Sequence, residues 1–400
     1  MNGLRPVDEA ISQLLDVAMP VSGIETRSLD AALGHCLAED VAATVNVPPA
    51  DNSAMDGYAF RYGDVAADEW IEVSARIAAG ETGTRLASGT VARIFTGAPI
   101  PAGADTVVMQ EDTDTVDGRI RIREMPARGS NVRACGQDIE AGHVVVQRGV
   151  RLTPASLGLI ASVGIASVRV MKPLRIAILS TGDELVEPGV VAGPGRIFNS
   201  NRYTLSGLLK SARFEVIDLG IVGDTPAATE EALDNAAAQA DCIITSGGVS
   251  VGEEDHVKAV VEKLGHIDLW KLAIKPGKPL AFGDVKGVPF FGLPGNPVST
   301  FVTFIVVARP FLLAMQGYSD TSYPTLQARS GFHFNAGSRR EYLRVRGRPA
   351  GGGVMELEMF SNQGSGVMSS VAWADALAEV EIGQTVSPGD LLRIYPLALA

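Results

Sequence analysis

Apolar and polar residues alternate with two different periods in the central part of the chain. Short apolar runs, typical of buried strands, follow one another, and stretches of helical period separate most of them. Strands are expected at 174–180, 214–219, 242–245, 267–274, 280–285 and 288–293, and helices at 201–212, 225–240, 254–264 and from 297 onward. Strands that alternate with helices of these lengths predict a three-layer α/β domain with a mostly parallel sheet.

The segments on either side of this α/β region have other patterns. The N-terminal part is helical in period, and short β-type runs between Gly and Pro turns follow it. The C-terminal part alternates apolar and polar residues, which favours a small β-barrel or sandwich. The expected parts are a connecting scaffold (1–46 and 141–172), an inserted β-rich domain (47–140), the α/β domain (173–324) and a C-terminal β-barrel domain (325–400).

The most apolar stretch of the chain, 298–315, is the one candidate for a membrane span in the sequence. It carries Ser and Thr side chains and is broken by an Arg309–Pro310 step, so we interpret it as a buried core helix or an interface helix, and not as a membrane span. Asp8 and Glu9 lie where a signal peptide would be positively charged, and no apolar segment follows them. These features predict a cytoplasmic protein that does not enter a membrane.

The formal net charge is -12, from 46 acidic and 34 basic residues. A chain of this charge repels phosphate backbones, which argues against nucleic-acid binding. It can bind a small anion only locally, with a few cations or backbone N–H groups. The three cysteines are far apart and form no Cys-x-x-Cys pair, so they indicate neither a zinc site nor a disulfide framework. They are packing residues or, alternatively, reactive thiols in a reducing cytosol.

Four polar loops follow strands of the predicted sheet. Ligands of an open parallel sheet bind outside the carboxyl ends of its strands, so these loops are expected to form one binding crevice. The loops are Thr181–Glu184, Ser246–Gly252, Lys275–Pro279 and Pro294–Pro297.

Two of these loops can offer backbone N–H groups to an anion. Ser246–Gly252 contains three glycines that allow close approach of a ligand, although a tight turn explains the same residues. Asn296 is a good N-cap before Pro297, and the N-terminus of the helix that follows attracts anions. The candidate binding residues in these loops are Ser246, Gly247, Gly248, Ser250, Pro294, Gly295 and Asn296.

Charged residues lie near the same edge of the sheet. Lys275 and Lys278 flank a Pro-Gly turn that can aim two ammonium groups at a tetrahedral dianion or a phosphate, unless both are simply solvated. The carboxylates nearby favour Mg²⁺, although each one alone can be a helix-start charge, and Asp224 is a natural N-cap. They are Asp183, Glu184, Asp224, Glu253, Glu254 and Asp255.

A run of arginines begins the C-terminal domain. We interpret it as a solvated strand face, with an anion-facing patch as the alternative. Its members are Arg339, Arg340, Arg344, Arg346 and Arg348.

A set of motifs spread over the whole chain is highly specific. They are Asp51–Ala59, Thr96–Pro99, Arg133 with Gly136 and Asp138, Ser180–Leu185, Asn201–Arg202, Ser246–Gly252, Lys275–Pro279, Gly292–Pro297 and Gln363–Ser365. On these residues the chain resembles the molybdopterin molybdenumtransferases (MoeA-type molybdenum insertases), including the C-terminal domain of gephyrin. The Ser-Gly-Gly loop alone is less specific, because molybdopterin adenylyltransferases are similar there.

The resemblance implies an elongated homodimer with a shared active site. The α/β domain would have the fold of the adenylyltransferases, and the inserted domain would reach the partner's crevice. By motif match, the catalytic residues would be Asp56, Thr96, Arg133, Asp138, Glu184, Lys275 and Lys278, with Ser365 as a further binding residue. The Mg²⁺ ligands would be Glu184, Asp224 and Asp255. Some relatives have Asp near Asn199, where this chain departs from them.

The implied reaction takes adenylyl-molybdopterin and molybdate to molybdenum-bound molybdopterin and releases AMP. Lysines and backbone donors would offset the charge of molybdate, and Mg²⁺ would neutralise the phosphates. The expected partners are a second copy of the chain, a molybdopterin adenylyltransferase and other proteins of the cofactor pathway.

Two other functions stay open on the sequence. The adenylyltransferase step would consume ATP and release pyrophosphate, and the flanking domains with their Asp56 and Thr96 motifs argue against it. A non-enzymatic scaffold is the other, since some fused relatives also cluster receptors, but the sequence shows no disordered linker.

Overall fold

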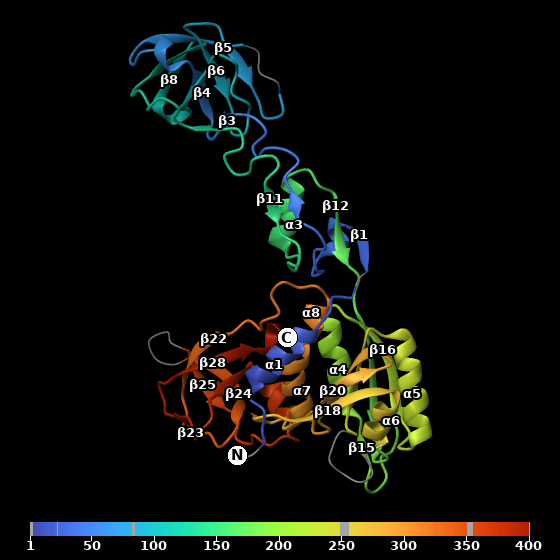
Figure 1. Ribbon diagram of the computed structural model, residues 1–400. Helices are drawn as coiled ribbons and strands as arrows, with labels where there is room; N and C mark the ends of the chain where they lie inside the picture. The colour runs from blue at the N-terminus through green and yellow to red at the C-terminus, as the bar shows by residue number, and fades with distance from the viewer. Residues whose placement is uncertain (1–2, 22, 82–84, 249–255, 350–354, 400) are drawn as a thin grey trace.

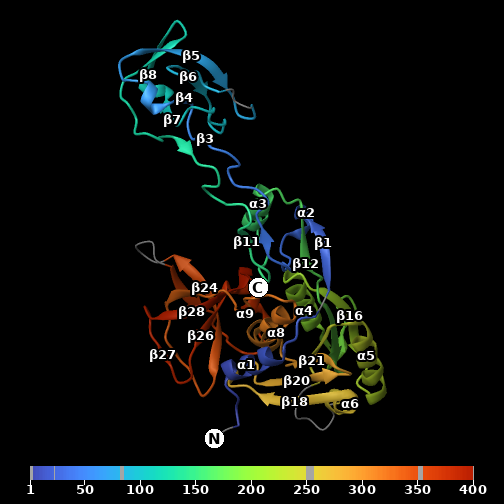
Figure 2. The same ribbon diagram turned by 45° about the horizontal axis from the view of Figure 1, so that its top comes forward.

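The molecule is elongated, with a broad base, a narrow connecting module and a separate β domain at the far end (Figure 1). This computed structural model describes residues 3–399, apart from residue 22 and the segments 82–84, 249–255 and 350–354. The α/β domain and the C-terminal domain lie side by side in the base, and a view turned by 45° shows the same arrangement (Figure 2).

The base contains the predicted α/β sheet. Its strands, in spatial order, are β16 (Glu215–Val222), β13 (Arg175–Thr181), β17 (Cys242–Ser246), β21 (Val288–Leu293), β20 (Pro279–Val285) and β18 (Gly265–Lys271). The first four run parallel, and the last two are antiparallel to their neighbours. Ser180 pairs with Ser246, and Ser246 with Leu293, so the carboxyl ends of β13, β17 and β21 are level.

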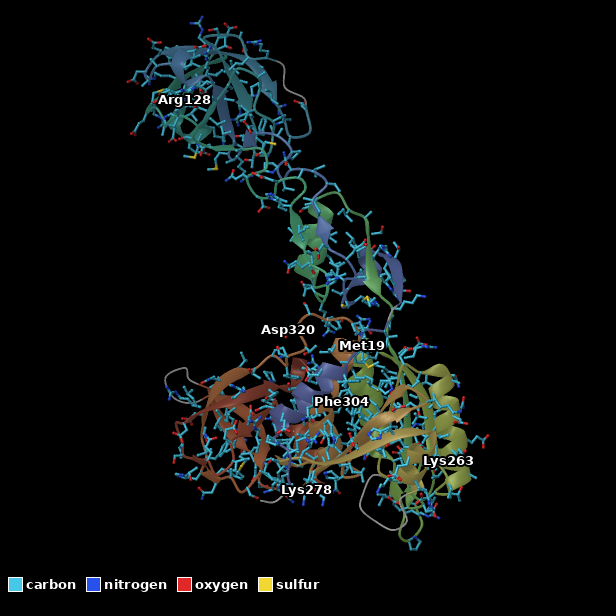
Figure 3. All side chains as sticks on the ribbon, viewed as in Figure 1. Met19, Arg128, Lys263, Lys278, Phe304 and Asp320 are labelled. Carbon is cyan, nitrogen blue, oxygen red and sulfur yellow. The ribbon has the colours of Figure 1, made fainter. Side chains whose placement is uncertain are left out.

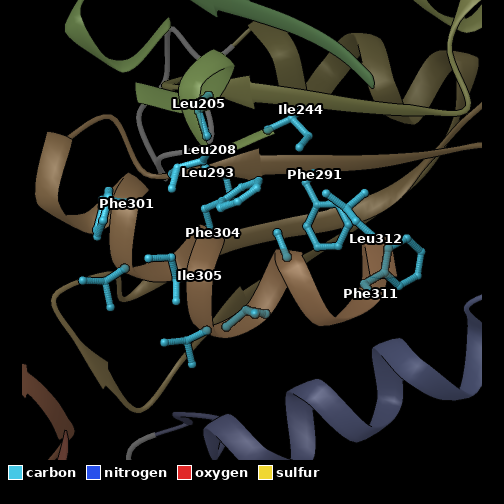
Figure 4. Packing of buried hydrophobic residues seen from close by; sticks show 14 of the residues in the cluster. Leu205, Leu208, Ile244, Phe291, Leu293, Phe301, Phe304, Ile305, Phe311 and Leu312 are labelled. Atoms are coloured by element: carbon cyan, nitrogen blue, oxygen red, sulfur yellow. The ribbon is translucent and has the colours of Figure 1, made fainter. Parts of the chain in front are cut away.

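Helices cover both faces of this sheet, because successive side chains of each buried strand point to opposite sides. Ile178 and Ile244 belong to one core, whereas Leu179 and Ile243 belong to the other. The first core packs against α4 (Ser200–Ser211) and the long helix that begins with α7 (Pro297–Thr303), and the second against α5 (Pro226–Gln239) and α6 (His256–Leu264). Figure 4 shows the first core. The predicted three-layer α/β domain is confirmed.

The long apolar helix is continuous, contrary to the predicted break at Arg309–Pro310. Between α7 and α8 (Arg309–Met315) it contains a π-helical turn, η3 (Phe304–Ala308), and Arg309 N–H donates to the Phe304 carbonyl. Pro310 has no N–H to donate, so one widened turn absorbs it. The helix is long and apolar enough to span a membrane, but 94% of its most apolar window is buried inside the molecule, as a core helix is.

The first helix of the expected connecting scaffold belongs to the base and not to the connecting module. The first helix, α1 (Val7–Val17), buries Val7, Ala10 and Leu14 in the core of the base beside α8, because these residues form one apolar stripe. The module itself contains β1 (Ile24–Ser28) paired with β12 (Ser167–Met171), β2 (Val41–Ala42) paired with β11 (Val144–Val146), and α3 (Pro154–Ser162).

The inserted domain is a β unit, as predicted. Its sheet contains, in spatial order, β7 (Thr106–Met109), β4 (Gly57–Phe60), β6 (Val91–Ile94), β5 (Trp70–Ile77), β9 (Arg119–Ile122) and β8 (Thr113–Val116). A short ribbon of β3 (Asn52–Ser53) and β10 (Val132–Arg133) joins this domain to the module.

The C-terminal domain is a closed barrel. Its ring of strands is β24 (Arg340–Pro349), β25 (Met355–Met359), β22 (Leu326–Ser330), β28 (Leu391–Pro396) and β26 (Ala376–Val380), which pairs again with β24. A two-residue strand of the α/β domain, β19 (Ile274–Lys275), adds to β24 in parallel. The barrel therefore holds one of the loops of the predicted crevice.

Two members of the arginine run, Arg340 and Arg344, are not solvated. The prediction of a solvated strand face is therefore wrong for these two residues. Arg344 is only 1% exposed and donates to the Tyr342 carbonyl and to Ser370 Oγ. Arg340 contacts the carboxylates of Asp8, Glu379 and Glu381. The alternation along β24 suggests one polar face, but α9 (Met368–Trp373) and the segment before it cover that face.

Candidate active site

A crevice of about 450 Å³ opens at the carboxyl ends of β13, β17 and β21. It brings together the loops that the sheet topology predicts, and the start of α4 adds to them. Its polar and glycine lining comes from Thr181, Glu184, Asn199, Ser200, Asn201, Ser246, Gly247, Gly295, Asn296 and Ser299. We call this space the glycine compartment.

A second cavity of about 250 Å³ adjoins it, and Pro279, Asn296 and Ser299 line both. Its other polar lining comes from Lys275, Lys278, Arg339, Gln363, Gly364 and Ser365. We call it the cationic compartment, because three of its side chains are bases. The barrel supplies Arg339 and the segment 363–365, so this compartment lies between the two domains of the base.

The turn after β17 needs glycine at two positions. Gly247 and Gly248 have φ angles of 89° and 66°, and a Cβ at Gly248 would lie 2.5 Å from Thr181 Oγ1. The Gly247 N–H donates to the Leu293 carbonyl at 3.1 Å, so it is not available to a ligand, which corrects part of the predicted anion nest. Ser250 and the rest of this loop lie outside the described residues.

The start of α7 faces both compartments, as predicted. Asn296 is the N-cap by position, and its side chain makes no capping hydrogen bond. The Ser365 carbonyl instead accepts a hydrogen bond from Val298 N at 2.9 Å. The barrel therefore satisfies one donor of this helix, and the Asn296 amide is left to line the cavity.

Two buried polar atoms on the wall of the glycine compartment have no partner among the described residues. They are Thr181 Oγ1 and Asn201 Oδ1. The Asn201 amide is fixed from its other side, because its Nδ2 donates to the Gly295 carbonyl at 2.8 Å. Buried polar groups are nearly always hydrogen-bonded, so these atoms suit a polar ligand.

Asn199, where some relatives have Asp, has a structural role here. It is buried and caps α4, with its Oδ1 accepting from Arg202 N at 3.4 Å and from Ser180 Oγ at 3.2 Å. An amide fulfils this cap without a charge.

The two predicted lysines differ in their surroundings. Lys275 Nζ lies 3.1 Å and 3.2 Å from the two carboxylate oxygens of Glu341, whose side chain is 5% exposed. Lys278 makes no ion pair within the described part of the chain, and its carbonyl accepts from Leu272 N at 2.7 Å. Arg339 Nη1 donates to the Ile274 carbonyl at 3.2 Å. No sequence motif contains Glu341, and Arg339 belongs to the run of arginines for which a solvated strand face was predicted.

The predicted metal ligands are only partly described. Glu184 lines the glycine compartment, and Asp224 follows β16, whereas Asp255 lies outside the described residues. The N-cap of α5 is Thr225 and not Asp224, because Thr225 Oγ1 accepts from Ala228 N. Residues 3–399, without the gaps given above, contain no group of three or more side chains placed to hold a metal.

Four predicted catalytic residues lie outside the crevice of their own chain. Asp56 and Thr96 belong to the inserted domain, and Arg133 and Asp138 to its junction with the connecting module, away from the base (Figure 1). Asp56 Oδ1 accepts from both the N–H and the hydroxyl of Thr96 at 2.8 Å. These two donors, the backbone one first, lower the pKa of Asp56 because they stabilise its charged form.

Replacing Thr96 by valine should raise the pKa of Asp56 toward its ordinary value. The substitution keeps the backbone donor but removes the hydroxyl that stabilises the charged form. If catalysis needs the carboxylate, the acid limb of the pH–activity profile moves to higher pH. An NMR titration of Asp56 measures the change in its pKa. The control is Thr90→Val, because the Thr90 hydroxyl donates to the Ala87 carbonyl and not to Asp56. An unchanged Asp56 titration contradicts this account.

Profiles of three protein regions match consecutive parts of the chain. They are "MoeA N-terminal region (domain I and II)" over residues 5–164, "Probable molybdopterin binding domain" over 177–314 and "MoeA C-terminal region (domain IV)" over 326–397. The second of them contains most of the crevice. Fold and site thus define a multidomain α/β protein of the molybdopterin-binding class.

Relatives of similar length narrow this class to one family. The chain is 40% identical to a molybdopterin molybdenumtransferase of Haemophilus influenzae, over 98% of each chain, and 37% identical to one of a Nostoc species, over 100% of this chain and 94% of that one. A solved molybdopterin biosynthesis MoeA protein of Pyrococcus horikoshii superposes with a TM-score of 0.83 at 27% identity, over 98% of this chain and 99% of that chain. The chain belongs to the molybdopterin molybdenumtransferase family. It is a transferase of molybdenum-cofactor biosynthesis.

Proposed function

We propose that the protein inserts molybdenum from molybdate into adenylyl-molybdopterin and releases AMP, in a reaction that depends on Mg²⁺. The observation that carries this proposal is the direct contact of two unlike compartments. One is lined by three cations, and the other by small and amide residues, two of which carry unsatisfied buried polar atoms. A reaction that joins an oxyanion to a nucleotide-linked pterin requires such neighbours.

Molybdate would occupy the cationic compartment. Lys275, Lys278 and Arg339 supply positive charge, and the N-terminus of α7 adds partial charge of the same sign. Glu341 holds Lys275 and the Ile274 carbonyl holds Arg339 before the substrate arrives, so these two bases can stabilise developing negative charge with little reorganisation. The molybdenum atom would then lie at the boundary with the glycine compartment.

The pterin and its adenylyl group would occupy the glycine compartment. Thr181 and Asn201 offer the unpaired buried atoms, and Ser246 and Asn296 add polar groups that can orient the ligand. Gly247 and Gly295 line this compartment without side chains, so the ligand can approach the backbone closely.

Mg²⁺ would be held by Glu184, with Asp224 and Asp255 as further candidate ligands. The oxygen donors suit this ion, and the Glu184 side chain has no hydrogen-bond partner within the described residues that would compete for it. The ion would supply charge neutralisation at the phosphates when the phosphoanhydride is cut.

The active site would be completed by a second copy of the chain. Asp56 and Thr96 are arranged as a catalytic carboxylate and its donor, yet they lie at the opposite end of the molecule from their own crevice. An inserted domain that reaches the partner subunit would bring Asp56 and Thr96 into the partner's crevice. A cytoplasmic location, and contacts with a molybdopterin adenylyltransferase and other pathway proteins, belong to the same proposal.

Mixing two inactive variants tests this arrangement. We expect Asp56→Ala and Lys278→Ala each to lose molybdate-dependent AMP release. Equal amounts, dissociated and reassembled together, should recover about a quarter of the wild-type rate. Half of the dimers are then mixed, and one of the two sites in each carries neither substitution.

Three outcomes have different meanings. Full activity of Asp56→Ala alone removes that residue from the site. Two inactive variants whose mixture forms mixed dimers and stays inactive contradict a shared site. Pyrophosphate release from ATP in the presence of molybdopterin favours the adenylyltransferase step instead.

A further inference from the structure

We propose that Glu341 is a positioning residue of the molybdenum transfer, which fixes the Lys275 ammonium and sets the charge of the cationic compartment. This inference rests on the proposed binding of molybdate in that compartment. No motif of the sequence analysis includes Glu341, and it touches the compartment only through the lysine.

The contact between the two side chains is close and two-sided. Both carboxylate oxygens of Glu341 lie within 3.2 Å of Lys275 Nζ, and one of them also accepts from Gly337 N at 3.4 Å. The Glu341 side chain is 5% exposed, whereas that of Lys275 is 47% exposed. The carboxylate is therefore the fixed partner, and the ammonium is held between it and the cavity.

The backbone reinforces this geometry. Lys275 is opposite Glu341 in the parallel pairing of β19 with β24. Arg340 N donates to the Ala273 carbonyl at 2.8 Å, and Arg339 Nη1 donates to the Ile274 carbonyl. Three consecutive barrel residues thus hold the segment that carries the lysine, so the barrel decides where the ammonium points.

Glu341 also decides the charge that an incoming anion meets. Among the described residues, three bases line the cationic compartment and one buried carboxylate, that of Glu341, contacts Lys275, which leaves a net charge of +2. Molybdate is a dianion, so the compartment matches its charge. Without Glu341 the compartment would bind any anion more tightly, and it would hold Lys275 less firmly.

A second buried glutamate in the barrel gives a matched control. Glu379 on β26 is 5% exposed, like an interior residue, and its oxygens lie 3.2 Å from Arg340 and 3.5 Å from Arg393. It does not line either compartment. Like Glu341→Gln, Glu379→Gln removes one buried negative charge from the barrel. It leaves the lining of the anion site unchanged.

The test is the steady-state kinetics of Glu341→Gln with molybdate as the varied substrate. The glutamine keeps an acceptor oxygen but removes the charge. We expect KM for molybdate to fall about fivefold, because the ground state is bound more tightly, and kcat to fall about tenfold, because the ammonium is no longer fixed. A structural defect does not lower KM, so the combined decrease is diagnostic.

The controls separate this inference from the proposed function. Glu379→Gln should leave both constants within about twofold of wild type. If Lys278→Gln does not raise KM for molybdate, the proposed location of the anion is wrong. If Lys278→Gln raises KM for molybdate, but Glu341→Gln leaves this KM unchanged or raises it, then only the role of Glu341 is overturned.

A shorter carboxylate provides a second route if the glutamine variant does not fold. Glu341→Asp keeps the charge but withdraws it from Lys275. We expect KM near the wild-type value and a kcat lowered severalfold, and an unchanged kcat overturns the positioning role.

Discussion

Replacing Lys278 by glutamine should lower kcat/KM for molybdate by about a hundredfold, equivalent to about 2.7 kcal/mol of lost transition-state stabilisation. Lys278 and Arg339 are the bases of the cationic compartment whose charge no carboxylate offsets within the described residues, whereas Lys275 shares its charge with Glu341. The backbone of Lys278 stays in place, because Leu272 N donates to the Lys278 carbonyl. The substitution therefore removes charge from the anion site without releasing the loop.

A lysine on the other face of the same domain is the control for this experiment. Lys263 lies on α6 and pairs with Glu230 at 2.7 Å, and Figure 3 shows it apart from Lys278 in the base. Lys263→Gln changes the net charge of the protein equally, so it reports any general electrostatic effect. A loss of similar size in both variants would mean that Lys278 does not act locally.

The sequence could predict the α/β domain because its physical determinants are local. Buried strands appear as short apolar runs, and the turn chemistry between them marks each helix start, as Thr225 before Pro226 shows. The parallel topology then brings the four loops to one edge without further information. Ser246, Gly247, Asn296 and Lys275 were found in this way.

What the sequence could not predict depends on contacts between distant segments. Glu341 lies 66 residues after Lys275 in the chain, and only the pairing of β19 with β24 makes them neighbours. Arg344 occupies a position that alternation assigns to solvent, but a following segment covers it. Similarly, no periodicity reveals that Asp56 lies far from the crevice of its own chain.

Replacing Arg344 by lysine should destabilise the protein by about 3 kcal/mol. The buried guanidinium donates to three groups, the carbonyls of Tyr342 and Gly364 and the hydroxyl of Ser370. A compact ammonium cannot reach all of them, so buried acceptors lose their donors. Since the segment 363–365 lines the cationic compartment, KM for molybdate should rise as well.

The pH dependence of the stability lost in Arg344→Lys shows whether the buried charge causes it. Burial lowers the pKa of Arg344 to about 10, so the wild-type side chain keeps its charge at neutral pH. A lysine starts from a pKa of about 10.4, and the same burial brings its pKa close to neutrality in the folded state only. Above that folded-state pKa the unfolded chain binds more protons, so the stability deficit of Arg344→Lys shrinks as the pH rises toward about 9.5.

Urea denaturation between pH 7 and 9.5, with hydrogen exchange of β24, measures the stability deficit and its change with pH. The control is Arg348→Lys on the same strand, whose exposed side chain pairs with Glu358 and should cost less than about 0.5 kcal/mol at any of these pH values. A deficit of Arg344→Lys that stays constant with pH would mean that the lost hydrogen bonds to Tyr342, Gly364 and Ser370, and not the buried charge, destabilise the barrel.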